Sequence, residues 1–75
     1  MVAHEIDARG LLCPEPIMLM HQAVRKLGVG AELQVITTDP AALRDVPQFC
    51  RFLGHALLQV DTKGAETFFR IKVKS

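Results

Sequence analysis

Residues 7–16 read Asp-Ala-Arg-Gly-Leu-Leu-Cys-Pro-Glu-Pro, and in this stretch a strand gives way to a helix. Gly10 breaks the strand pattern that precedes it. Pro14 fits the first position of a helix, because the N–H that proline lacks would be unpaired there anyway. Glu15 in the first turn suits the positive end of the helix dipole. The stretch therefore predicts a helix with Cys13 as its N-terminal cap.

The first helix is predicted to bury one apolar stripe, and Gly28 or Gly30 is expected to end it. Residues three and four positions apart share one face of a helix. The residues of this stripe are Ile17, Met20, Val24 and Leu27.

A second apolar stripe at helical spacing lies in the middle of the chain. It is formed by Ala42, Val46, Phe49, Cys50 and Leu53. Asp39 and Pro40 read as its cap and first helical residue, and Gly54 as its end. Pro47 lies inside the pattern and leaves two alternatives open. Either one helix kinks there, or a short turn from Pro40 precedes a new helix capped by Asp45.

Four strands are predicted, over residues 4–8, 32–38, 55–61 and 66–74, with a hairpin turn at 62–65. In the last strand apolar and basic residues alternate, which is typical of one buried and one solvated face. The element order is β-α-β-α-β-β, which predicts an α/β (α+β) two-layer sandwich. Two helices should cover one face of a four-stranded mixed sheet, and the whole chain, residues 1–75, should form one domain.

The size and charge of the chain narrow the range of functions. A chain of 75 residues has little room for a deep, closed active site, which favours a carrier or a binding module. The net charge of +1 lacks the clustered basic excess of a nucleic-acid binder. No apolar run is long enough to span a membrane, and the first ten residues hold no signal-peptide core. We therefore expect a cytoplasmic protein with free thiols and no membrane or direct nucleic-acid partner.

Cys13 is the residue that is expected to carry chemistry. The thiolate is the nucleophilic form of cysteine, and a helix N-terminus favours it modestly, while the nearby Glu15 opposes it. Pro14 and Pro16 have no N–H, so few donors surround the sulfur, chiefly the amides of Glu15 and Ile17. This predicts a sulfur held at the helix tip. The alternative is that Cys13 is a small buried side chain that happens to precede a helix.

Several other residues are candidates for a functional role. Cys50 is expected to pack in the core, although a redox pair with Cys13 is an alternative. Met18 is either an exposed partner contact or part of a wider core stripe. Arg9 and Arg44 either lie near the active tip and attract an acidic partner, or are ordinary surface charges. No metal-ligand spacing involves the cysteines, so no metal or cofactor is predicted, and the three histidines are expected to be solvated.

The whole chain resembles the TusA (SirA-like) sulfur-carrier family. The resemblance rests on residues 7–16, with the motif Cys13-Pro14-Glu15-Pro16 after Gly10-Leu11, and on residues 39–50, which are similar to the second helix of TusA. It implies the same β-α-β-α-β-β sandwich. It also implies that Cys13 is the persulfide-carrying residue, with Gly10, Pro14, Glu15 and Pro16 positioning it.

The resemblance further implies a sulfurtransferase that acts as a stoichiometric persulfide relay. A cysteine desulfurase would load Cys13, and a TusBCD-like relay complex would accept the sulfur for 2-thiouridine formation at the tRNA wobble position. Alternatives within the family are sulfur delivery to molybdenum-cofactor synthesis and sulfur oxidation. A non-catalytic RNA- or protein-binding regulatory module is the alternative from another class. A carrier that docks two partners in turn is expected to be a monomer.

Overall fold

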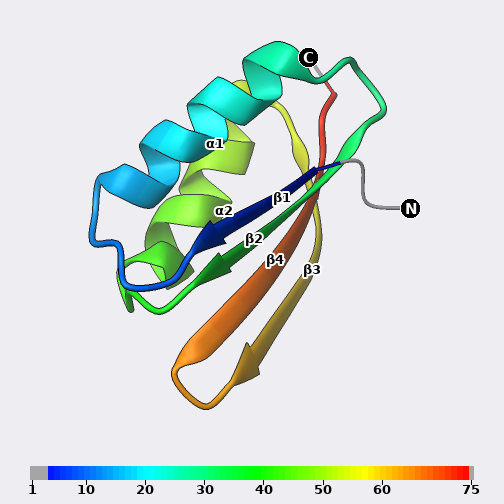
Figure 1. The fold of residues 1–75 in the computed structure, drawn as a ribbon. Coiled ribbons are helices and arrows are strands. Elements are labelled where there is room, and N and C mark those ends of the chain that lie inside the picture. The colour runs from blue at the N-terminus through cyan, green and yellow to red at the C-terminus, as the bar shows by residue number, and fades with distance from the viewer. Residues whose placement is uncertain (1–3, 75) are drawn as a thin grey trace.

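The computed structural model describes residues 4–74 as two helices packed on one face of a four-stranded sheet (Figure 1). The elements are β1 (His4–Ala8), α1 (Glu15–Lys26), β2 (Glu32–Thr37), α2 (Ala42–Leu53), β3 (Ala56–Lys63) and β4 (Glu66–Lys72). The predicted order and the two-layer mixed architecture are confirmed. None of the helices formed by residues 4–74 is long and apolar enough to cross a membrane.

The strands lie in the order β1-β2-β4-β3, so the last strand of the chain runs inside the sheet. β1 pairs with β2 in parallel, whereas β4 is antiparallel to both of its neighbours. The hairpin pairs Lys63 with Glu66, so its turn is shorter than predicted. The parallel pair matters for the site, because the carboxyl ends of β1 and β2 meet at one edge of the sheet.

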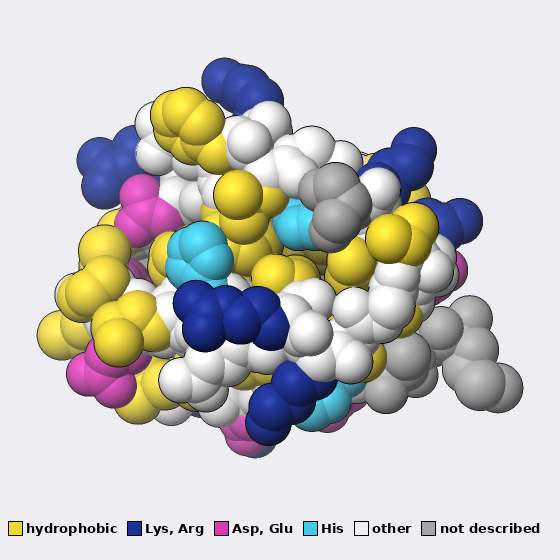
Figure 2. All heavy atoms as spheres, turned by 90° about the horizontal axis from the view of Figure 1, so that it is seen from above, with side chains coloured by type: hydrophobic (Ala, Val, Ile, Leu, Met, Phe, Trp, Pro, Cys, Tyr) yellow, Lys and Arg dark blue, Asp and Glu magenta, His cyan; other side chains and the backbone are white. Residues whose placement is uncertain are grey.

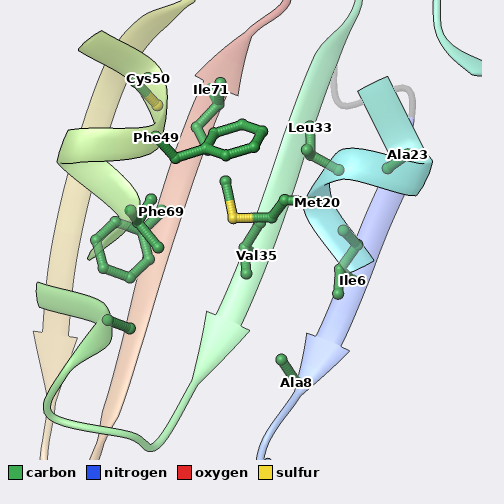
Figure 3. Packing of buried hydrophobic residues seen from close by; sticks show 12 residues of the cluster. Ile6, Ala8, Met20, Ala23, Leu33, Val35, Phe49, Cys50, Phe69 and Ile71 are labelled. Carbon is green, nitrogen blue, oxygen red and sulfur yellow. The ribbon is translucent and has the colours of Figure 1, made fainter. Parts of the chain in front are cut away.

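The core lies between the helices and the covered face of the sheet. Its largest fully buried side chains include Phe69, Met20 and Leu33. Met20 from α1 and Phe49 from α2 point toward one another above the strands (Figure 3). The alternation predicted for β4 is confirmed, since Phe69 and Ile71 are buried while Arg70 and Lys72 are exposed.

The buried face of α1 is rotated from the predicted stripe. The residues that the helix buries are Pro16, Met20 and Ala23. Ile17, Val24 and Leu27, which were predicted to be buried, are only partly covered and pack at the margin of the core. The reason is that a two-layer sandwich offers α1 two neighbours, the sheet below and α2 beside it. The spacing of apolar residues along α1 does not show which of them contact the sheet and which contact α2.

α2 runs unbroken from Ala42 to Leu53, with Pro47 inside it, so a new helix capped by Asp45 is wrong. The cap is Ala41 and not Asp39. Asp39 instead closes the turn before the helix, where its backbone carbonyl accepts a hydrogen bond from the Ala42 amide at 3.0 Å. One oxygen of its side chain also accepts from the amide of the cap residue Ala41, at 3.1 Å.

Gly54 ends α2 in the left-handed conformation, with φ of 76°, as its predicted role requires. We expect Gly54→Ala to lower the free energy of unfolding by roughly 1–2 kcal/mol, because a Cβ is strained in this conformation. Urea denaturation measures the change. Gly28→Ala is the matched control, since Gly28 has no positive φ and no atom would crowd its Cβ. Equal losses in both variants would contradict the explanation.

His55 departs from the prediction that all three histidines are solvated. It is buried after α2, and its Nδ1 accepts a hydrogen bond from the Lys74 amide at 3.1 Å. This burial lowers the pKa of His55. His4 and His21 are exposed, and the His21 ring meets Phe49 edge-on with 4.8 Å between the ring centroids. The sequence around His55 predicted the start of a strand, and this local pattern does not reveal the contact with Lys74 that buries the imidazole.

Candidate functional site

Cys13 lies in the turn before α1, and its side chain is exposed. The prediction that it caps the helix is wrong by one residue, because the cap is Pro14 and the helix begins at Glu15. The Glu15 amide donates to the carbonyl of Leu12 at 2.9 Å, which closes a turn around the cysteine. The Cys13–Pro14 peptide bond is cis. The sulfur therefore stands on a tight turn ahead of the helix.

The loop that follows β2 holds this turn in place. The Cys13 amide donates to Oδ2 of Asp39 at 2.8 Å, and the Gly10 amide donates to Oγ1 of Thr38 at 2.8 Å. The other Asp39 oxygen, Oδ1, accepts from the Ala41 amide at 3.1 Å. Both loops leave the same edge of the sheet because β1 and β2 are parallel. Asp39 is thus a site residue that the sequence analysis assigned only to a helix cap.

The charges around the thiol disfavour its ionisation. Hydrogen bonding to Asp45 is the main cause that raises the pKa of Cys13 above its usual value, followed by desolvation and the charges of Asp45 and Asp39. Arg44 acts in the opposite direction, and its Nε donates to Oδ1 of Asp45 at 3.1 Å. The same contacts with Cys13 and Arg44 lower the pKa of Asp45.

The predicted modest activation of Cys13 by the helix end is therefore wrong. The carboxylates that oppose ionisation come from Asp45 and Asp39, and not from the predicted Glu15. The dipole effect falls off within the first turn of a helix. Here the sulfur stands one residue ahead of the cap, whereas α2 brings an acidic side chain directly beside it.

An apolar groove of about 360 Å³ leads away from Cys13 between α1 and α2. Its lining comprises Cys13, Pro14, Ile17, His21, Asp45, Gln48, Phe49, Phe52 and Leu53. Phe52 is 84% exposed, which is unusual for so large an apolar side chain. Exposed hydrophobic side chains also lie beside histidine and basic residues on the face seen in Figure 2. Patches of this kind on small proteins mark contact surfaces.

The remaining predicted site residues are spread over the molecule. Arg9 is held by Asp7, with 2.7 Å between Nη2 and Oδ2, and by Glu66 at 3.3 Å. This pairing lowers the pKa of Asp7 to about 2. Arg44 lies at the thiol, whereas Met18 is 55% exposed on α1, four residues after Pro14. The exposure of Met18 excludes the wider core stripe, and Met18 is not among the residues that line the groove.

Cys50 packs in the core as predicted, with 3% of its surface exposed. Burial raises the pKa of this thiol to about 11. It lies five residues beyond Asp45 on α2, a rise of about 7.5 Å. Both cysteines are free thiols. Cys50 therefore lacks the exposed, ionisable character of a redox partner for Cys13.

Within residues 4–74 no three side chains of His, Cys, Asp or Glu are grouped so that they could hold a metal ion. Fold and site together define a small α/β sandwich protein that presents one thiol on a surface turn at the mouth of an apolar groove.

Comparison with known proteins shows which protein family this chain belongs to. The family described as Sulfurtransferase TusA matches residues 4–75. A sulfur carrier protein TusA of Pseudomonas putida is 50% identical over 70 residues, which cover 93% of this chain and 88% of the relative. Its counterpart in Pseudomonas syringae pv. syringae is 49% identical over 71 residues, covering 95% and 84%. The chain belongs to the TusA family of sulfur carriers, and sulfur transfer is its general activity.

A solved structure supports the fold independently. The crystal structure of a SirA-like protein from Desulfitobacterium hafniense superposes with a TM-score of 0.83. It covers 96% of this chain and 99% of its own, at 19% sequence identity. At this identity the likeness concerns the β-α-β-α-β-β sandwich alone.

Proposed function

We propose that this chain accepts sulfur as a persulfide on Cys13 from a cysteine desulfurase and relays it to a TusBCD-like complex. The destination is 2-thiouridine at the tRNA wobble position. The observation that carries the proposal is the exposed thiol on a turn fixed by Asp39, in a chain of the sulfur-carrier family. The protein acts as a stoichiometric carrier, a monomer that docks its partners in turn and does not bind the tRNA itself.

The transfer is a thiol exchange at a sulfur–sulfur bond. The Cys13 sulfur attacks the terminal sulfur of the donor persulfide, a new S–S bond forms, and the donor S–S bond breaks. The donor cysteine leaves as a thiolate and takes up the proton that Cys13 loses, so no oxidant or reductant is consumed. The same exchange, with the acceptor cysteine as nucleophile, unloads the carrier. Both steps require a sulfur that another protein can reach, which the exposure of Cys13 supports.

The groove beside Cys13 offers the surface on which the donor docks. Its lining includes both Cys13 and the exposed Phe52. A large aromatic side chain that is exposed in the free protein gains most from burial in a complex.

Phe52→Ala is expected to slow loading by the desulfurase by about fivefold or more, because truncation of an aromatic anchor typically costs a complex about 1 kcal/mol or more. The free energy of unfolding should change little, since Phe52 is 84% exposed. Loading rates from quenched mass spectrometry, together with urea denaturation, measure both effects. Leu43→Ala is the matched control, because Leu43 is a 51% exposed apolar residue on α2 outside the groove lining. Equal slowing by the two variants would count against docking in the groove.

The destination of the sulfur is tested by following radiolabel from cysteine. The protein is mixed with the desulfurase, a reconstituted TusBCD-like complex, the thiolating enzyme and tRNA. We expect label in 2-thiouridine only when this chain is present. Label that reaches a molybdenum-cofactor synthesis protein or a sulfur-oxidising enzyme, and not tRNA, would favour one of those pathways. Full biological activity of a Cys13→Ser variant would favour the non-catalytic module.

A further inference from the structure

Two carboxylates near the start of α2 contact Cys13, those of Asp39 and Asp45. One contacts its backbone and the other lies beside its sulfur. Both oxygens of Asp39 accept backbone hydrogen bonds, one of them from the Cys13 amide at 2.8 Å. Asp39 therefore fixes the main chain. Asp45 lies beside the sulfur itself, where both residues line the groove, and its side chain is only 16% exposed.

We propose that Asp45 is a positioning residue of the sulfur transfer, whose carboxylate holds the unloaded Cys13 as a thiol at the mouth of the groove. This inference rests on the proposed role of Cys13 as the persulfide carrier. It predicts that the exposed cysteine reacts slowly with small oxidants and electrophiles at neutral pH. The thiolate, and not the thiol, attacks such reagents, and the neighbouring carboxylate keeps the thiolate scarce.

Three charged groups act on the sulfur, and they come from the two segments packed against its turn. Asp39 lies in the loop after β2, while Arg44 and Asp45 lie in the first turn of α2. Arg44 is the only one of the three that favours the thiolate. Its side chain is 74% exposed and is tied to Asp45 at 3.1 Å, so it offsets only part of the carboxylate charge. The balance of the three charges favours the protonated sulfur.

Holding the thiol does not prevent transfer from a docked donor. In that exchange the proton of Cys13 ends on the departing donor sulfur, so the overall reaction releases no proton to solvent. Docking on the apolar groove also removes water from the thiol and fixes the two sulfurs at reacting distance. The partner supplies this arrangement, whereas a small reagent in solution does not. Asp45 thereby favours transfer within a complex over reaction in open solvent.

The test is the pH dependence of Cys13 alkylation by iodoacetamide in the free, full-length protein, followed by peptide mass spectrometry. Asp45→Asn keeps the shape of the side chain and removes its charge. We expect its reaction midpoint to fall to lower pH and its rate at pH 7 to rise about threefold or more, as the thiolate fraction increases. The plateau rate at high pH should fall slightly, because thiolate nucleophilicity decreases with pKa. Arg44→Gln should move the midpoint to higher pH.

Glu15→Gln is the matched control, because it removes a carboxylate only two residues from Cys13 in the sequence. Its midpoint should match that of the wild type. An Asp45→Asn midpoint that is unchanged, or no lower than that of Glu15→Gln, overturns the inference. The readout is independent of sulfur loading. If the wild type loads sulfur while the midpoints coincide, the proposed function stands and only the role of Asp45 fails, whereas a wild type that never loads Cys13 refutes the proposed function.

Discussion

Cys13→Ser is expected to abolish persulfide loading altogether while the protein keeps its fold. A serine hydroxyl cannot form the sulfur–sulfur bond that the carrier needs, so no residual transfer through this position remains. The free energy of unfolding should change by less than about 0.5 kcal/mol, because Cys13 is exposed and its contact with Asp39 is made by the backbone amide. Intact mass spectrometry after incubation with a cysteine desulfurase and cysteine measures the bound sulfur.

Cys50→Ser is the matched control for this loss. Cys50 is the other free thiol, buried in the core with its pKa raised to about 11. This variant should still gain one sulfur atom, although a buried hydroxyl in place of the thiol is expected to cost about 1–3 kcal/mol of stability. Sulfur that persists in the Cys13→Ser protein and disappears in Cys50→Ser would reverse the assignment of the carrier residue.

Phe69→Ala is expected to have the largest effect on stability, a loss of about 3–5 kcal/mol. Phe69 has no exposed surface and lies on β4, the interior strand that pairs with both β2 and β3. Its ring faces the core between the sheet and α2 (Figure 3). Removing it leaves a cavity that β4 cannot move to close, because this strand is held by pairing on both sides. Urea denaturation followed by circular dichroism measures the difference.

Phe68, the neighbour of Phe69 in the sequence, is the matched control for this prediction. Phe68 has the same side chain on the other face of β4, where it is only partly buried and Lys63 Nζ lies 5.7 Å from its ring centroid. Phe68→Ala should lose less than half as much stability as Phe69→Ala. Similar losses would mean that the uncovered face of the sheet carries as much packing energy as the core. A typical domain has only about 5–15 kcal/mol of stability, so Phe69→Ala would leave much of the protein unfolded on warming.

The sequence alone determined the order of the elements and the exposure of Cys13 just ahead of the first helix. Alternation of apolar and polar residues in β4, the helical spacing around Met20 and Phe49, and Gly54 at the end of α2 each depend on local geometry. Each of these patterns extends over fewer than a dozen residues, so a short stretch of sequence is enough to specify the element that it forms. Gly10 and the two prolines predicted where the first helix begins to within one residue, since its cap is Pro14 and not Cys13.

Tertiary structure decided the strand order, the rotation of α1 and the electrostatics of the thiol. Asp39 and Asp45 lie 26 and 32 positions beyond Cys13 and reach it only because β1 and β2 run parallel and α2 then passes beside α1. Both were identified from the sequence only as possible caps of a helix. Charge interactions depend on distance in space, which local patterns do not encode, so the sign of the pKa shift at Cys13 could be predicted only from the folded chain.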